Sequence, residues 1–436
     1  MNISAMVQIV LFAVGGPERA ALRVSSPPSA VGRPFQGRQG RSDVDRLLAE
    51  GRAALEASKL GEAESALDRA LALAPENREA QVQLGIVYLF TGRLAQARFL
   101  FQTSSGADRD DAATLTRIAS AYIRAQRASD AEPYLSRALA QAPSSVDASV
   151  LLGQVYLATG RAERAIETLQ NAVRIDPTIA HAHYFLGIAF TQSGRREPGL
   201  EELQQAAALA PENAGFGFYL GLAYLEARRD NEAAIALDRV VRLTPNDVEA
   251  RINLAWALIN AGKSSQAAAT LQDIVARQPK HVVAWFLLGE ATRRQGDDER
   301  AIESYERAVA IDPKMIDALF SLGSLAYARH DLDQAAAWFA KLFAVDPDHP
   351  GGHYQVGKMA LQAGRVDDAI AHLEICARLD PANKGAHYQL SRAYKIKGDE
   401  QGAARELAAF RALGAQTADD SDARDQRIDR IGSRRR

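Results

Sequence analysis

Eight histidines are the side chains of this 436-residue chain whose type suits metal binding or acid–base chemistry. His181 and His183 are two residues apart, which on a helix turns their rings about 200° away from each other. Neither lies beside a carboxylate at a spacing typical of a metal site. The sequence therefore predicts no metal site, and no cofactor is expected.

Acidic pairs and the single cysteine offer no catalytic arrangement either. Glu201–Glu202 and Asp367–Asp368 are expected near the starts of helices, where carboxylates favour the helix dipole and face solvent. Cys376 has no second cysteine to pair with, and we expect it to be a buried, inert thiol. The sequence has no G-x-S-x-G motif and no phosphate-binding loop. We therefore expect a protein that is not an enzyme and has no catalytic residues.

The composition is rich in aliphatic side chains and almost balanced in charge. Hydrophobic residues make up 47% of the chain and aromatic residues 7%, which favours closely packed helices over a core of large rings. The 52 basic and 54 acidic residues leave a formal net charge of -2. This balance gives no strong field for nucleic acid or a charged membrane surface, so neither is expected as a partner.

Prolines recur along the chain at a fixed interval of 34 residues. The series, which is in phase with Pro75, consists of Pro143, Pro177, Pro211, Pro245, Pro279, Pro313, Pro347 and Pro381. Placing this proline at position 32 of a unit that begins at Val44 gives 11 repeats, the last of which runs from Lys384 to Thr417. A period of this length indicates an array of similar supersecondary units.

Small residues at three positions of the repeat indicate two closely packed helices. Position 8 is Gly in eight repeats, position 20 is Ala in ten, and position 15 is Gly in seven. A recurring Gly inside a helical pattern indicates a close helix–helix approach, and we expect the small residue at position 20 to be its partner. A left-handed Gly at position 15 would end the first helix and turn the chain. The repeat is therefore expected to be an antiparallel helix pair.

The fourth repeat carries these positions in full: Leu152-Gly153-x-x-Tyr156, then Ala165, Leu169, Ala172 and Pro177. This pattern resembles the tetratricopeptide repeat (TPR) family. The resemblance implies an all-α fold, a right-handed superhelical solenoid of about 11 helix-turn-helix repeats of 34 residues. It also implies that the first helix of each repeat lines a concave groove.

Some repeats depart from the pattern. The second repeat has Arg109 in place of the proline, so we expect its second helix to end early and the junction near it to be looser. The third has Pro133 near the start of its second helix, which is tolerable only in the first turn. Three repeats carry a histidine at position 4, where the family has a large packed side chain, and we expect these histidines to be framework residues: His183, His353 and His387.

The two ends of the chain differ from the array, which we place at residues 43–417. Residues 1–42 are expected to be a disordered leader, because Gly, Pro, Ser and Arg dominate it beyond residue 15. Residues 3–14 form an apolar run that is too short to span a bilayer, so no transmembrane segment is expected. If residues 1–15 act as a signal segment the protein is exported, and otherwise it is cytoplasmic. Residues 418–436 form a charged tail or a capping helix.

The family resemblance assigns positions 2, 5, 9, 12 and 13 of the first helix to the groove. Aromatic residues fill position 5 in six repeats, and basic residues gather at the other groove positions of the last four repeats. The candidate partner-binding residues are therefore Tyr184, Phe218, Phe286, Phe320, Tyr354, Tyr388, Arg293, Arg294, Lys358, Arg392 and Lys395. Aromatic anchors and cations suit a peptide that is acidic where it meets the C-terminal half. Two alternatives stay open: the aromatic rings support neighbouring repeats, and the charges are simply solvated.

The sequence thus favours a non-catalytic scaffold or adaptor that binds peptide segments or partner proteins in its groove. An alternative is a regulatory or substrate-recruiting subunit of an enzyme complex, in which another chain supplies the catalytic site. A third is a purely structural spacer. No motif in the sequence names a partner.

Overall fold

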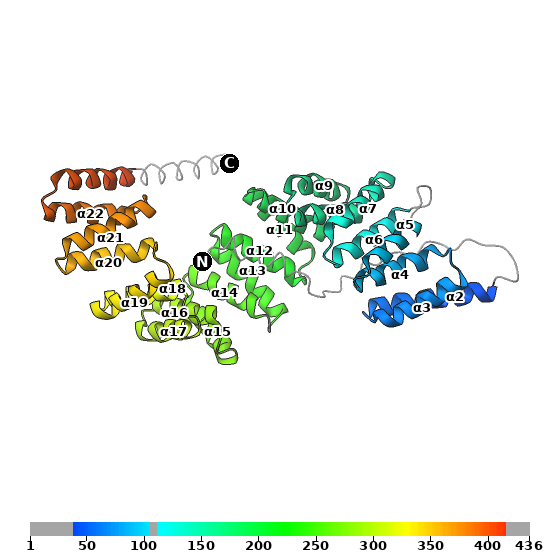
Figure 1. The fold of residues 1–436 in the computed structure, drawn as a ribbon, viewed down its shortest axis with the longest axis horizontal. Coiled ribbons are helices and arrows are strands. Elements are labelled where there is room, and N and C mark those ends of the chain that lie inside the picture. Colours follow the sequence, from blue (N-terminus) through cyan, green and yellow to red (C-terminus); the bar gives the residue numbers. More distant parts are fainter. Residues whose placement is uncertain (1–37, 105–110, 416–436) are drawn as a thin grey trace, which may run out of the picture. The chain divides into compact units, whose positions relative to one another are not determined.

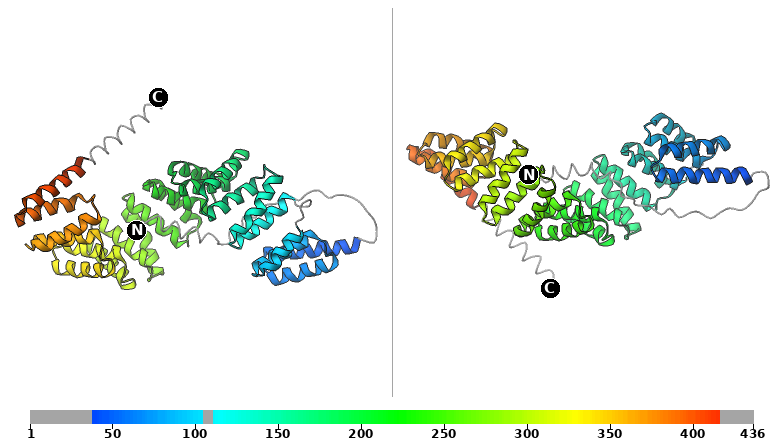
Figure 2. Two further views of the ribbon diagram at one scale, coloured as in Figure 1. Left: turned by 45° about the horizontal axis from the view of Figure 1, so that its top comes forward. Right: turned by 90° about the horizontal axis from the view of Figure 1, so that it is seen from below.

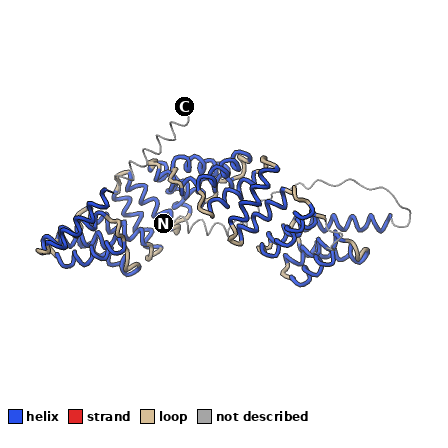
Figure 3. The backbone as a smooth tube through the Cα atoms, turned by 90° about the horizontal axis from the view of Figure 1, so that it is seen from above, coloured by secondary structure: helices blue, strands red, loops and turns tan. Residues whose placement is uncertain are grey.

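The computed structural model describes residues 38–104 and 111–415. The expected leader up to residue 37, the segment 105–110 with Arg109, and the expected tail from residue 418 lie outside the described residues. Every regular element within the described residues is a helix, as predicted (Figure 3). The chain divides into two compact units between Leu243 and Thr244, and each unit is a series of antiparallel helix pairs (Figures 1 and 2).

The first unit contains the repeats up to the sixth. Its first helices are α2 (Arg38–Glu56), α4 (Arg78–Phe90), α6 (Ala112–Arg124), α8 (Val146–Ala158), α10 (Ala180–Gln192) and α12 (Ala214–Glu226). Its second helices are α3 (Leu60–Leu73), α5 (Leu94–Ser104), α7 (Ala128–Gln141), α9 (Ala162–Ile175), α11 (Arg196–Leu209) and α13 (Asp230–Leu243). Helix α2 starts six residues before Val44, within the segment that we assigned to the leader.

The second unit contains the repeats from the seventh onward. Its first helices are α14 (Val248–Asn260), α16 (Val282–Arg294), α18 (Ile316–Ala328), α20 (Pro350–Gln362) and α22 (Lys384–Lys397). Its second helices are α15 (Ser264–Arg277), α17 (Asp298–Ile311), α19 (Leu332–Val345), α21 (Val366–Leu379) and the helix 400–415.

Helix starts follow the repeat frame. From α4 onward, each first helix begins at position 1 of its repeat, and in all of them except α10 and α18 the side chain at position 34 is an N-cap. The Asn, Asp and Ser residues that accept a hydrogen bond from the backbone N–H three residues later are Asn77, Asp111, Ser145, Asn213, Asp247 and Asn383. Such caps satisfy one of the N–H groups that a helix start leaves unpaired.

The turn between the two helices has a left-handed residue at position 15 in all 11 repeats. The seven glycines there have φ between 73° and 87°. In the other four repeats the same conformation is taken by non-glycine residues with φ between 57° and 60°: Ser58, Gln126, Arg228 and His330. A side chain in this region costs about 1–2 kcal/mol, so the turn geometry is imposed by the packing of the two helices.

The close approach predicted at position 8 is confirmed, but its main partner is not position 20. A Cβ added to Gly153 would lie 2.4 Å from Leu169, and one added to Gly289 would lie 2.5 Å from Tyr305. Leu169 and Tyr305 both occupy position 24, one turn beyond the position that we expected. The absent side chain at position 8 therefore makes room for a large buried side chain. Only at Gly187 does the backbone of position 20, the Gly199 carbonyl, come as close as 2.9 Å.

Pro133 lies deeper in its helix than expected. Helix α7 starts at Ala128 and continues through Pro133 to Gln141, so the proline lies beyond the first turn. There it cannot donate a hydrogen bond to the carbonyl four residues earlier, which costs about 3 kcal/mol in a helix interior. Packing holds the helix together, because Ala131, Leu135 and Ala138 are all fully buried.

Candidate functional site

The first helices form a continuous surface in each unit. Consecutive first helices contact each other directly, for example α4 with α6 in the first unit, and α18 with α20 and α20 with α22 in the second. This arrangement places the groove positions of successive repeats beside one another. A partner that spans several repeats would therefore meet side chains from successive first helices.

The position-5 aromatic residues pack against two kinds of neighbour. Tyr184 contacts Phe216 of the next first helix, whereas Phe286 and Tyr388 contact Tyr305 and Phe410 of the second helix of their own repeat. Tyr184 and Phe286 are buried, at 7% and 6% exposure, whereas Phe218, Phe320 and Tyr354 are half-buried. Tyr388 is 43% exposed. These rings therefore differ widely in the area that a partner could touch.

Two of these contacts show how the rings join the repeats. The ring of Phe320 lies 3.0 Å from where a Cβ on Gly351 would be, and the hydroxyl of Tyr354 lies 2.7 Å from where one on Gly385 would be. Both glycines occupy position 2 of the next repeat. The rings thus pack against the following first helix, and part of their role is structural.

Two of the candidate cations are engaged within the protein. Arg293 donates to Glu290 at 3.0 Å, and Arg294 donates to the Ile259 carbonyl at the end of α14 at 2.9 Å. Arg294 therefore caps the preceding first helix. Any partner of these two guanidinium groups has to share them with the contacts already made.

Lys358, Arg392 and Lys395 form what we call the C-terminal basic cluster. The Lys358 ammonium lies 5.0 Å from the centroid of the Tyr327 ring and 5.3 Å from that of Tyr354. Arg392 donates to the amide oxygen of Gln389 at 3.0 Å, and both Arg392 and Lys395 are exposed. Within the described part of the chain, none of the three cations is paired with a carboxylate.

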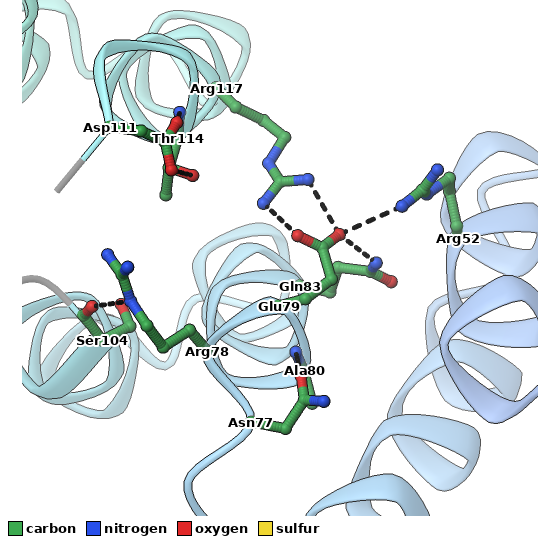
Figure 4. Close-up of polar contacts among 10 residues, drawn as sticks. All are labelled: Arg52, Asn77, Arg78, Glu79, Ala80, Gln83, Ser104, Asp111, Thr114 and Arg117. Carbon is green, nitrogen blue, oxygen red and sulfur yellow. Dashed lines mark hydrogen bonds and ion pairs between the residues drawn. The ribbon is translucent and has the colours of Figure 1, made fainter. Parts of the chain in front are cut away.

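The first helices of repeats one to three carry a different arrangement, which we call the Glu79 network (Figure 4). Arg117 of α6 binds both carboxylate oxygens of Glu79 of α4, at 2.8 and 2.6 Å. Arg52 of α2 donates to the same carboxylate at 3.2 Å and Gln83 at 2.5 Å. One carboxylate therefore ties three consecutive first helices together.

The electrostatics of Glu79 reflect these contacts. Its burial acts to raise the pKa of the carboxyl group, but the hydrogen bonds and charge of Arg117, with help from Gln83 and Arg52, outweigh burial and hold the pKa below its usual value. Nearby, Arg78 donates from Nε to the carbonyl of Ser104, the last residue of α5, at 2.8 Å (Figure 4). This bond satisfies a carbonyl at the end of the helix whose repeat lacks the usual proline.

The sequence matches models of a known protein family. Models described as tetratricopeptide repeat match residues 116–178, 184–248, 252–316 and 354–419, and a second set of the same description matches residues 54–117 and 293–354. These matches cover more than half of the chain. The chain belongs to the tetratricopeptide repeat family.

Solved TPR structures resemble parts of the chain. YrrB, described as a TPR protein with an unusual peptide-binding site, is 22% identical over 42% of this chain and 95% of its own, with a TM-score of 0.41. PilF of Pseudomonas aeruginosa is 23% identical over 50% of this chain and 97% of its own, with a TM-score of 0.39. Yeast Tom70 is 14% identical over 87% of this chain and 90% of its own, with a TM-score of 0.40. No curated protein matches the sequence.

The position-4 histidines are part of the TPR framework, as predicted. His183, His353 and His387 each use Nε2 to contact the carbonyl of the proline at position 32 of the preceding repeat, at 2.9–3.1 Å. Trp285 makes the same bond to Pro279 at 2.9 Å, and Gln81 makes it to Pro75 at 2.9 Å. The bond is thus a link between neighbouring repeats that recurs with His, Trp or Gln at position 4, whereas Ser149 and Arg251 at the same position donate to other groups.

One expectation about the acidic pairs is wrong. Glu202 does not simply face solvent near the start of a helix, because it lies in the middle of α11 and its Oε2 is 2.6 Å from Nδ1 of His183. The histidine sits at position 4 and the carboxylate at position 23 of one repeat, a pairing that only the fold brings together. Asp367 and Asp368 do lie in the first turn of α21.

The remaining candidates for chemistry lie in structural positions. Cys376 is fully buried, and burial raises the pKa of its thiol to about 11, so it is inert at neutral pH as expected. In residues 38–104 and 111–415, no three His, Cys, Asp or Glu side chains gather as a metal site would require. The described helices include none with the length and apolar character needed to cross a membrane.

Proposed function

We propose that this TPR protein is a non-catalytic scaffold or adaptor that binds acidic peptide segments on the first helices of repeats ten and eleven. TPR proteins generally mediate protein–protein interactions, and this is the coarse function of the chain. The location rests on one observation: the C-terminal basic cluster has no carboxylate partner in the described chain. In the first unit, by contrast, Arg52 and Arg117 both pair with the carboxylate of Glu79.

The surroundings of the cluster suit a peptide. Tyr388 presents an exposed ring one helical turn from Arg392 on α22, and an exposed aromatic residue beside a cation can anchor an apolar residue next to an acidic one. The Lys358 ammonium is held over the two tyrosine rings, which reduces the side-chain entropy that it loses when a carboxylate binds. A regulatory subunit that recruits substrates to a separate enzyme would use the same surface.

The test compares two triple variants with equal change in charge. Lys358→Glu, Arg392→Glu and Lys395→Glu together reverse the cluster. The control reverses three exposed arginines on second helices, Arg307→Glu, Arg378→Glu and Arg411→Glu. The ligands are immobilised decapeptides whose glutamate content rises from none to half at constant Leu and Phe content.

We expect the wild-type protein and the control variant to bind the acidic peptides best. The cluster variant should bind them about 10- to 100-fold more weakly, because each exposed ion pair contributes about 0.5–1 kcal/mol and each reversal adds repulsion. The difference should shrink at high salt, where exposed charges are screened. Equal binding by the two variants, with helicity unchanged, would show that the cluster is not the binding surface.

Replacing the aromatic residues is a weaker test. Phe320 and Tyr354 pack against the first helix of the next repeat, so Phe320→Ala or Tyr354→Ala would loosen the stack and reduce binding for a structural reason. The charge reversals avoid this ambiguity, since Arg392 and Lys395 lie at the surface.

A further inference from the structure

One side-chain pair recurs in three repeats with a single change of chemistry. Position 4 holds a histidine, and its Nδ1 faces the residue at position 23 of the same repeat. The partner is a glutamate in two repeats, at 2.6 Å for His183 with Glu202 and at 2.7 Å for His387 with Glu406. In repeat ten the partner is a second histidine, and the two Nδ1 atoms of His353 and His372 are 2.9 Å apart.

The hydrogen-bonding partners determine how many protons each pair can hold. In all three repeats Nε2 of the position-4 histidine faces a backbone carbonyl, which only accepts, so Nε2 carries a hydrogen. In the His–Glu pairs, a second ring proton on Nδ1 would donate to the carboxylate. In the His–His pair only one hydrogen fits between the two Nδ1 atoms. When both rings are charged, two N–H donors and two positive charges face each other.

The environment of the pair opposes that doubly charged state. His353 is only 6% exposed, and the ring of Phe343 of α19 packs against both imidazoles, with centroids 4.6 and 6.0 Å away. Burial lowers the pKa of His372, and the charge on His353 lowers it further. Asp368 opposes this shift, while Arg365 adds to it. Asp368, the carboxylate that opposes the shift among the described residues, is itself paired with Arg365 at 3.3 Å.

The next helix does not supply a compensating carboxylate. Helix α22 packs against α21, and it directs Tyr394 to Glu374 and Lys397 to Asp367. These carboxylates are therefore already engaged on the side of α21 that meets α22. The His353–His372 pair therefore depends on at least one of its two rings staying uncharged.

A third histidine, at the start of α20, also has to stay uncharged to make its contact. His349 is the N-cap of α20, and its Nδ1 accepts a hydrogen bond from the backbone N–H of Gly352 at 3.0 Å. Burial lowers the pKa of His349, with Asp346 and Asp317 acting to raise it and His353 to lower it. A protonated Nδ1 could not accept this bond, and a positive charge at a helix N-terminus is unfavourable.

We propose that His349, His353 and His372 form an acid-sensitive contact that holds α20 to α21 at neutral pH and loosens repeat ten when the pH falls below about 6.5. His349 and His372, whose pKa is lowered in the folded chain, stabilise the fold above their unfolded pKa. That stability is lost as the pH falls from the unfolded pKa through the folded one. Repeats five and eleven carry a His–Glu pair at these positions, so the pair itself gives no such loss there.

This contact would also regulate binding. Tyr354 and Lys358 follow His353 on α20, so loosening α20 would disperse the C-terminal basic cluster and release a partner in a mildly acidic environment. This regulatory step rests on the proposed function. The acid sensitivity itself does not, and it can be measured on the full-length protein without any partner.

The test uses hydrogen exchange of the full-length protein at pH 7.5 and pH 5.5. Peptides from α20 and α21 are compared with peptides from α14 and α15 in the same sample. Residues 248–277 contain no histidine, so the ratio of the two cancels the intrinsic effect of pH on exchange. In the wild-type protein, protection of α20 and α21 should fall about tenfold relative to α14 and α15.

Two substitutions and a transplant make the test specific. His372→Glu gives repeat ten the pair found in repeats five and eleven, and it should remove most of the fall. Adding His349→Asn, which keeps an N-cap at either pH, should remove the rest. Glu202→His places the His–His pair in repeat five, and α10 and α11 should then lose more protection at pH 5.5 than they do in the wild-type protein.

Either of two results would overturn the proposal. One is a wild-type ratio that does not change between the two pH values. The other is a fall that persists in full after His372→Glu, since that would place the sensitivity outside the pair. A loss of peptide binding with the exchange pattern intact would concern the proposed function alone.

Discussion

The first helices of repeats one to three and those of repeats ten and eleven both present cations, yet the two regions treat them differently. Arg52 and Arg117 both donate to the carboxylate of Glu79, and these ion pairs join three first helices. Among the described residues, Lys358 contacts two aromatic rings and Arg392 an amide, and neither pairs with a carboxylate. Where a carboxylate such as Glu79 lies among the cations, their charge is used in contacts between helices. Where no such carboxylate is present, as in the C-terminal basic cluster, we propose that the charge binds a partner.

Replacing Glu79 should remove this difference between the two regions. Glu79→Gln leaves Arg52 and Arg117 without a counter-charge, and it should destabilise repeats one to three by about 1–3 kcal/mol, since the pair is partly exposed. It should also give the first unit a new affinity for acidic decapeptides. Chemical unfolding and peptide binding measure the two effects. Unchanged stability would show that the network contributes nothing to the junction.

Replacing the proline inside α7 should change the free energy of unfolding of the same region by a similar or smaller amount. Pro133→Ala restores a backbone donor inside α7 and should stabilise repeat three by about 1–3 kcal/mol. Hydrogen exchange of α7 reports the change, with α9 as the reference. A loss of protection in α7 would mean that the proline is needed for the packing around it.

The pH response should also separate the two regions. The pKa of Glu79 is held below its usual value, so the stability from the network is present above the unfolded pKa of about 4.3 and is lost as the pH falls through the folded pKa. Repeat ten should respond at a higher pH, where its histidines are protonated. Exchange measured in steps from pH 7 to about pH 3 should show α20 and α21 loosening before α4 and α6. The reverse order would contradict both assignments.

The left-handed turns offer the smallest of these effects. Gln126 of repeat three and His330 of repeat nine take φ of 57° and 60°. Replacing either with Gly should stabilise its repeat by up to about 1 kcal/mol, because relief of strain is partly offset by the greater freedom of Gly in the unfolded chain. Thermal melting of each variant gives the shift. A destabilised variant would mean that the native side chain makes a contact that outweighs its strain.

The sequence predicted best those features that recur with the repeat period. The left-handed position 15 and the close approach at position 8 recur in the same frame, so each copy supports the others. The depth of Pro133 in its helix could not be predicted without knowing where α7 starts. The contact with position 24 could not be predicted without knowing which side chain covers the glycine at position 8.

The site was less accessible to sequence reasoning because its contacts join residues from different helices. Tyr184 is buried against Phe216 and Tyr219 of the neighbouring first helix, which a single repeat does not reveal. The links from Glu79 to Arg117 and from His183 to Glu202 span 38 and 19 residues. Family positions identified the surface, but only the packed structure separates cations that are already engaged from those that are not.

The most direct test of the account is to map where an acidic peptide binds. A photo-crosslinking amino acid replaces Tyr388, which is exposed beside the C-terminal basic cluster, or Phe99, an aromatic residue of α5 that is 63% exposed and serves as the control. The probe is the acidic decapeptide that the wild-type protein binds most tightly. The account predicts crosslinks at position 388 that disappear at high salt, and none above background at position 99. Equal crosslinking at both positions, or none at 388, would contradict it.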